Sequence, residues 1–166
     1  MNIETIPQLI KSSAAQHPNS SALIYQQEEI SFRELQDLSL RAAKGLSEIG
    51  IKKNDRVAFW LPNCPAYVVL YLACAQLGAI AVAVNTRFRS SEIADILSRS
   101  RAKTLILWPG FRNLDFLKIL AEIDESVFSH LESLILYSEE DAIQDLPPLL
   151  QSKQIIDYTQ LIKNEA

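Results

Sequence analysis

The chain has 166 residues, of which 48% are hydrophobic and 22% charged, and its formal net charge is −4. This apolar content predicts an ordered domain with a buried core rather than a disordered segment, and the length favours one domain. The acidic balance, without a run of basic residues, argues against nucleic acid as a partner. No basic stretch followed by an apolar stretch opens the chain, so we predict no secretory signal and expect the cytoplasm as the compartment.

The first fifty residues have the pattern of two helices separated by two short strands. The expected elements are a helix at 3–16, strands at 22–26 and near Ile30, and a helix from Ser31 to Gly50. Ser31 and Glu34 match the capping box, in which each side chain accepts the backbone N–H of the other residue. Apolar residues then recur on one face until Gly50, which suits a helix end.

The middle of the chain alternates between strand and helix patterns. We expect strands at 57–61, 79–84, 103–108 and 133–137, and helices from Pro65 to about Leu77, from a cap at Ser90 to about Ser100, and at 113–124. This alternation predicts an α/β fold with a mostly parallel sheet and flanking helices. Residues 57–86 carry no charge, but prolines and a glycine interrupt them at turn positions, which favours a buried β-α-β core over a membrane span.

The tail is less regular than the rest of the chain. Residues 139–166 are expected to continue the same domain as residues 1–138. An acidic run at Glu139–Asp141 and the pair Pro147–Pro148 predict a surface loop, and a strand or a helix is expected near 155–162.

Few residues have the spacing that a catalytic or metal site requires. The four glycines do not cluster, so the sequence contains no glycine-rich phosphate loop. His17 and His130 have no nearby ligand or nucleophile partner, and we interpret both as surface or capping residues. The paired carboxylates are interpreted as solvated surface, and Trp60, Tyr67, Tyr71, Cys64 and Cys74 as core residues with reduced thiols.

Arg87 and Arg89 form the basic pair with the clearest functional promise. They follow a buried strand at its carboxyl end, where ligands bind in open parallel sheets, and the helix that begins near Ser90 adds N–H groups that favour anions. The alternative is that both arginines face solvent and pair with Glu92 or Asp95. The sequence leaves the two interpretations open.

Three blocks of sequence stand in an order and spacing that resemble the start of acyl-CoA synthetases. They are ISFREL (30–35), KKNDRVAFWLPNCPAY (52–67) and LACAQLGAIAVAVNTRFRSSEI (72–93). Over roughly residues 5–138 the chain therefore resembles the adenylate-forming, AMP-dependent synthetase/ligase superfamily. Ala83 stands where many members have proline, at a position that carries no chemistry.

The resemblance implies a partial N-terminal domain of the adenylate-forming fold, from an ATP-dependent carboxylic acid–CoA ligase that works through an acyl-adenylate in fatty acid metabolism. ATP, Mg²⁺ and CoA are the implied cofactors. The family's phosphate loop and catalytic lysine would lie beyond Ala166, so we expect this chain alone to be inactive and to bind none of these groups tightly.

The resemblance also implies one site residue, because an arginine that matches Arg87 lies near the nucleotide part of CoA in such ligases. Arg87 is therefore the candidate contact to a CoA phosphate, and no catalytic residue or metal ligand is assigned. The alternative function is a non-catalytic binding or interaction module derived from the same fold. A partial sheet with exposed apolar faces would also self-associate.

Overall fold

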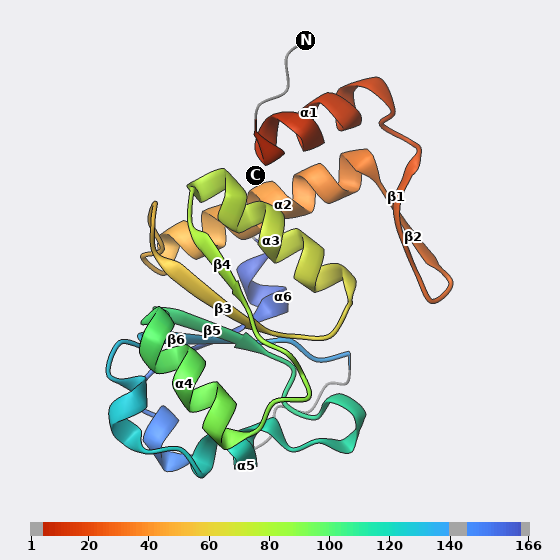
Figure 1. Ribbon diagram of the computed structural model, residues 1–166. Coiled ribbons are helices and arrows are strands. Elements are labelled where there is room, and N and C mark those ends of the chain that lie inside the picture. The colour runs from red at the N-terminus through yellow and green to blue at the C-terminus, as the bar shows by residue number, and fades with distance from the viewer. Residues whose placement is uncertain (1–4, 140–145, 164–166) are drawn as a thin grey trace.

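The computed structural model describes residues 5–139 and 146–163, and its centre is a five-stranded parallel sheet (Figure 1). The strands are β1 (Ser21–Tyr25), β2 (Glu28–Ser31), β3 (Arg56–Trp60), β4 (Ile80–Ala83), β5 (Thr104–Leu107), β6 (Ser133–Leu136) and β7 (Gln154–Asp157). The helices are α1 (Ile6–Gln16), α2 (Phe32–Glu48), α3 (Pro65–Leu77), α4 (Ser90–Ser100), α5 (Phe116–Ala121) and α6 (Tyr158–Leu161), with short 3-10 segments at Phe111–Asn113, Glu125–Phe128 and Pro148–Leu150. β1 and β2 form a separate antiparallel hairpin beside the sheet.

The strand order is β4-β3-β5-β6-β7, and every pair in this sheet is parallel. The chain therefore winds outward from β3 in both directions, as in doubly wound α/β proteins. One buried cluster joins α1, α2, α3 and α6 to one face of the sheet, and a second joins α4 and α5 to the other face. The predicted α/β class, with a mostly parallel sheet and flanking helices, is confirmed.

α2 and α3 follow the sequence prediction closely. At the start of α2, the Ser31 hydroxyl accepts the Glu34 backbone N–H at 3.3 Å, and the Glu34 carboxylate accepts the Ser31 N–H at 2.8 Å. α3 begins at Pro65, which has no N–H to leave unpaired in a first helical turn. It ends before Gly78, whose φ of +69° is a conformation that glycine adopts without strain. Local signals therefore fix the helices that cover one face of the sheet.

Two helix predictions need correction. Arg89 rather than Ser90 is the cap of α4, and Ser90 is the first helical residue. The helix expected at 113–124 is shortened to α5 because Leu114, with ψ of 123°, and Asp115, with ψ of 88°, are not helical, and Glu122 already caps the other end. Asp115 then caps α5 by accepting the Lys118 N–H at 2.9 Å.

The two ends of the chain add detail to the predictions. α1 is capped by Thr5, and the part of the expected helix that precedes Thr5 lies outside the described residues. So do residues 140–145, which include most of the predicted acidic loop. The segment near 155–162, expected to be a strand or a helix, forms both, because β7 pairs with β6 and leads directly into α6.

Three of the residues interpreted as core are buried, one is half-buried and one is exposed. Cys64 and Cys74 are buried free thiols, as predicted, and burial raises the pKa of Cys74 to about 12. Trp60 is fully buried and Tyr67 is half-buried. The core interpretation of Tyr71 is wrong, because 41% of this residue is exposed on the outer side of α3.

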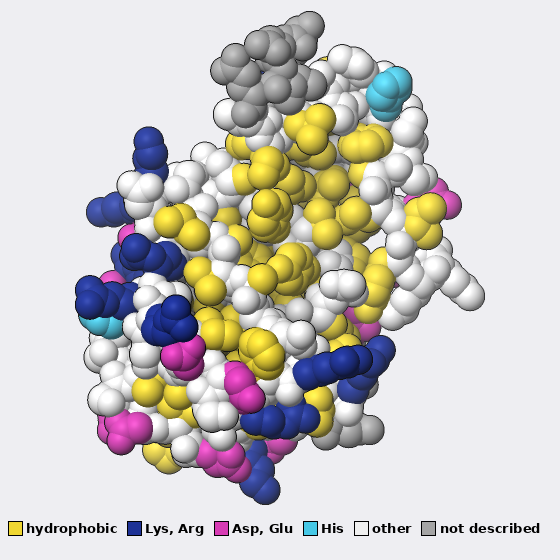
Figure 2. Space-filling model, viewed as in Figure 1, with side chains coloured by type: hydrophobic (Ala, Val, Ile, Leu, Met, Phe, Trp, Pro, Cys, Tyr) yellow, Lys and Arg dark blue, Asp and Glu magenta, His cyan; other side chains and the backbone are white. Residues whose placement is uncertain are grey.

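An apolar strip crosses α1, α3 and β4 on the face shown in Figure 2. The exposed large hydrophobic residues of these three elements include Leu9, Tyr71 and Ile80. The predicted self-association assumed exposed sheet faces, whereas helices cover both faces of the described sheet. The association itself stays a prediction. None of the helices in the described ranges has both the length and the apolar composition that a membrane crossing needs.

Candidate functional site

The candidate site lies at the carboxyl edge of the sheet, where the five parallel strands all end. In a doubly wound sheet this edge is the usual place for ligands, because the connecting loops open there while helices cover both faces. The loop from β4 to α4, residues 84–89, contains Arg87 at this edge. Trp108, Tyr137 and Tyr158 directly follow β5, β6 and β7 at the same edge. The structure thus brings together residues that are far apart in sequence.

Arg87 lies where the sequence predicts, with its guanidinium in solvent. The residue is exposed, and no hydrogen bond or ion pair to this guanidinium is found within the described parts of the chain. Its backbone N–H donates to Asn85 Oδ1 at 2.9 Å. A guanidinium presents paired donors in one plane, which match the oxygens of a phosphate. Arg87 is therefore available to bind an anion.

Arg89 is also exposed but uses its guanidinium differently. Its Nη1 atom donates to the carbonyl oxygens of Arg87 at 2.9 Å and Phe88 at 3.0 Å. Its backbone N–H donates to Glu92 Oε2 at 3.1 Å. Hydrogen bonds from the backbone of Glu92 and of Arg89 hold the pKa of Glu92 below its ordinary value, so this carboxylate stays charged at the start of α4.

The alternative pairing of the two arginines is wrong for their guanidinium groups. Among the described residues, Asp95 pairs with Arg99 at 3.4 Å, and Glu92 accepts the Arg89 backbone N–H and the Ser91 hydroxyl rather than an arginine guanidinium. The prediction that both arginines face solvent is correct. The basic pair therefore divides into one arginine that supports the loop and one whose guanidinium has no partner within the described residues.

A row of aromatic side chains continues along the carboxyl edge. Tyr137 packs edge-on against Trp108 at a centroid distance of 5.1 Å and against Tyr158 at 5.4 Å. Burial raises the pKa values of Tyr137 and Tyr158, so both rings stay neutral at ordinary pH. A groove of 430 Å³ separates this row from the β1-β2 hairpin, and Tyr25 and Glu139 line its sides.

Sequence reasoning missed this aromatic row, although a signal was present. Trp108, Tyr137 and Tyr158 each stand one residue beyond a strand, and parallel strands in register bring such positions side by side. His17 and His130, in contrast, lie on the surface as predicted, and His17 follows the last residue of α1 as its cap.

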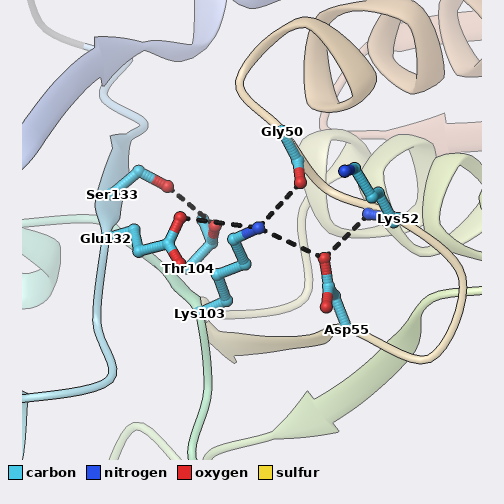
Figure 3. A network of polar contacts seen from close by, with 7 residues as sticks. All are labelled: Gly50, Lys52, Asp55, Lys103, Thr104, Glu132 and Ser133. Atoms are coloured by element: carbon cyan, nitrogen blue, oxygen red, sulfur yellow. Dashed lines mark hydrogen bonds and ion pairs between the residues drawn. The ribbon is translucent and has the colours of Figure 1, made fainter.

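The amino edge of the sheet carries a different set of polar residues (Figure 3). Lys103 Nζ donates to the Gly50 carbonyl at 2.8 Å and forms ion pairs of 3.4 Å with Asp55 and with Glu132. Asp55 also accepts the Lys52 backbone N–H at 2.9 Å. These contacts hold the starts of β3, β5 and β6 together, and every polar partner is a residue of the chain itself. The network is therefore structural.

Comparison with known proteins places the whole described sheet within one family. The family model described as AMP-binding enzyme matches residues 10–163. The medium-chain acyl-CoA ligase ACSF2 of Rattus norvegicus is 34% identical over 122 residues, which are 72% of this chain and 20% of the relative. The human enzyme of the same name is 30% identical over 168 residues, which cover 100% of this chain and 25% of the relative. The chain thus spans a fifth to a quarter of the length of these curated relatives.

Solved structures agree on the fold. An anthranilate CoA ligase, AuaEII, in complex with anthranoyl-AMP superposes with a TM-score of 0.81 at 20% identity, over 98% of this chain and 28% of that protein. The N-terminal domain of FACL13 from Mycobacterium tuberculosis gives a TM-score of 0.69 at 24% identity, over 99% of this chain and 37% of that protein. At these identities the likeness concerns the fold alone.

Proposed function

Because this chain belongs to the AMP-binding enzyme family, we propose that it forms part of the N-terminal domain of an ATP-dependent carboxylic acid–CoA ligase that works through an acyl-adenylate. The observation that carries the proposal is the family match over residues 10–163, which includes every strand of the sheet. The relatives named as medium-chain acyl-CoA ligases support the reaction class. A solved neighbour that is itself an N-terminal domain supports the position within the enzyme.

The described residues fit only one of the three cofactors. No group of three His, Cys, Asp or Glu side chains in the described ranges could hold a metal ion, and the four glycines are scattered along the chain. We therefore derive no step through ATP or Mg²⁺ from these residues. The free guanidinium of Arg87 does fit an anion, and we assign to it a contact with a phosphate of CoA.

In this proposal the chain positions CoA and does not carry the reaction. A contact to a CoA phosphate contributes to CoA binding and does not touch the acyl group. Its loss should therefore raise the KM for CoA and leave adenylate formation unchanged. The 166-residue chain alone is proposed to be inactive. The cytoplasm stays a prediction, since the named mammalian relatives are mitochondrial enzymes.

The second candidate is a non-catalytic binding or interaction module with the same fold. It is supported by the two buried clusters, which cover both faces of the sheet with helices of this chain alone. The genomic sequence beyond codon 166 separates the candidates. A reading frame that continues into a phosphate loop favours the ligase segment, whereas an independent gene without a remainder favours the module.

Exchange of pyrophosphate into ATP, with a panel of carboxylic acids, tests the proposed function. We would compare the 166-residue chain with a chimaera in which residues 10–163 replace the matching segment of a medium-chain acyl-CoA ligase, after circular dichroism shows that the chimaera is folded. We expect exchange and acyl-CoA formation by the chimaera and no exchange by the chain alone. A folded chimaera without activity would contradict the ligase assignment, and exchange by the short chain would contradict its inactivity.

A further inference from the structure

The loop that carries Arg87 is tied to the buried core at its first turn. Trp60 is fully buried at the end of β3 and stacks on Phe116 with a centroid distance of 4.2 Å and an interplanar angle of 12°. Its indole Nε1–H donates to the Asn85 carbonyl at 3.2 Å. The Val84 N–H also donates to the Phe59 carbonyl at 2.9 Å, which extends the pairing of β3 and β4. The loop therefore leaves the sheet in a fixed direction.

Hydrogen bonds with Asn85 and Arg89 hold the rest of the loop. Asn85 accepts the Arg87 N–H at its side-chain oxygen and the Phe88 N–H, at 3.0 Å, at its carbonyl. Arg89 donates from a single Nη1 atom to the carbonyls of Arg87 and Phe88. Both backbone polar groups of Arg87 are thus bonded inside the loop, while its guanidinium has no partner within the described residues.

The ordered backbone of Arg87 has a physical consequence for ligand binding. A ligand that binds a flexible loop must order that loop, and the ordering entropy is subtracted from the affinity. Here hydrogen bonds already order the Arg87 backbone. One of them comes from Arg89, whose guanidinium donates to two carbonyl oxygens of the loop. Both bonds come from one nitrogen whose two N–H groups are fixed in the guanidinium plane, whereas the lysine ammonium rotates on a flexible stem.

We propose that Arg89 is a positioning residue, which holds the β4-α4 loop so that the Arg87 guanidinium is presented to a phosphate group. The inference rests on the proposed function, because the phosphate is the one we assign to CoA. Arg89 acts through Arg87 and does not itself contact the ligand. Asn85 and Trp60 complete the support from the side of the sheet.

The order of the loop is measured first, on the 166-residue chain without ligand. We would record backbone ¹⁵N relaxation for residues 86–88 in the wild type, in Arg89→Ala and in Arg89→Lys. Arg99→Ala is the matched control, because it removes one positive charge from α4, the helix that Arg89 caps, at a residue whose side chain pairs only with Asp95 in the described chain. We expect increased motion of residues 86–88 in both Arg89 variants and none in the control. Unchanged order in Arg89→Ala would overturn the inference, whether or not CoA binds.

A double-mutant cycle then distinguishes positioning from direct contact. In the active chimaera, we expect Arg89→Ala to raise the KM for CoA about three- to tenfold and to leave adenylate formation unchanged, with a smaller effect for Arg89→Lys. In an Arg87→Ala background, the same Arg89 substitution should have no further effect on KM. Additive effects would show that Arg89 contacts CoA itself and would overturn the positioning role. An unchanged KM in Arg87→Ala alone would instead remove the proposed phosphate contact, which is a separate failure.

Discussion

The amino and carboxyl edges of the five-stranded sheet use their polar residues differently. At the amino edge, Lys103 is only 22% exposed in its side chain and is surrounded by a carbonyl and two carboxylates from neighbouring loops. At the carboxyl edge, the guanidinium of Arg87 is exposed and has no partner within the described residues. The two basic residues sit at opposite ends of the same sheet, and only one of them is used by the fold.

In this doubly wound sheet, the polar residues at the amino edge stabilise the fold, and the proposed binding residue lies at the carboxyl edge. Charges at the amino edge are satisfied by the chain and hold strand starts in register. The carboxyl edge keeps an open groove and the exposed Arg87, whose guanidinium has no partner within the described residues. We therefore expect substitutions at the amino edge to lower stability, and substitutions of exposed groups at the carboxyl edge to leave it unchanged.

The largest expected effect tests the packing of α6 against α2, which lie on the same face of the sheet. A Cβ added to Gly45 in α2 would clash with the carbonyl oxygen of Leu161, in the helix that follows β7. We expect Gly45→Ala to lower the free energy of unfolding by about 3 kcal/mol, although alanine is the better helix former. Urea denaturation measures this difference. A stabilised variant would show that α6 does not pack on α2 as described.

The buried hydroxyl pair at the amino edge should come next. Thr104 Oγ1 and Ser133 Oγ lie 2.7 Å apart and are both buried. Thr104→Val leaves the Ser133 hydroxyl without this partner, so we expect a loss of about 2 kcal/mol in urea denaturation. The double variant Thr104→Val, Ser133→Ala removes both polar groups and should recover most of that loss. Additive losses would mean that the pair is not a mutual hydrogen bond.

Alkaline pH should weaken the carboxyl edge through Tyr158. Burial raises the pKa of this phenol in the folded chain, so the unfolded chain releases the proton first, near pH 10. Stability is therefore full below pH 10 and falls above it, by about 1 kcal/mol between pH 10 and pH 11 for this group. The pH dependence of urea denaturation measures the slope, and Tyr158→Phe should reduce it. An unaltered slope in that variant would assign the effect to other groups.

Lys103→Met tests the amino-edge network directly. Methionine keeps the apolar stem but removes the bond to Gly50 and both ion pairs, which are only partly shielded from solvent. We expect a loss of about 1 kcal/mol in urea denaturation. Arg87→Met at the opposite edge is the matched control and should change stability by less than about 0.5 kcal/mol. Equal losses of stability in the two variants would contradict the proposed difference between the two edges.

The ability to predict these features depended on how local their causes are. The start of α2 follows from Ser31 and Glu34, and the bounds of α3 follow from Pro65 and Gly78, because each signal acts within one helical turn. The extended backbone of Leu114, which delays the start of α5 to Phe116, has no such signal in the sequence.

The candidate site divides in the same way. The place of Arg87 at the carboxyl edge could be predicted, because it depends only on a strand followed by a helix. The Lys103 network could not, since its partners Gly50, Asp55 and Glu132 come from loops that only the sheet order brings together. The supporting role of Arg89 depends on side-chain direction, which sequence spacing does not specify.

The central claim is that the carboxyl edge presents Arg87 to a phosphate of CoA, and steady-state kinetics of the active chimaera tests it most directly. We would compare Arg87→Ala with Arg99→Ala, measuring the KM for CoA and the rate of pyrophosphate exchange in each. The account predicts a KM for CoA raised about tenfold in Arg87→Ala alone, with exchange unchanged in both variants. A KM for CoA that is the same in both variants would contradict it.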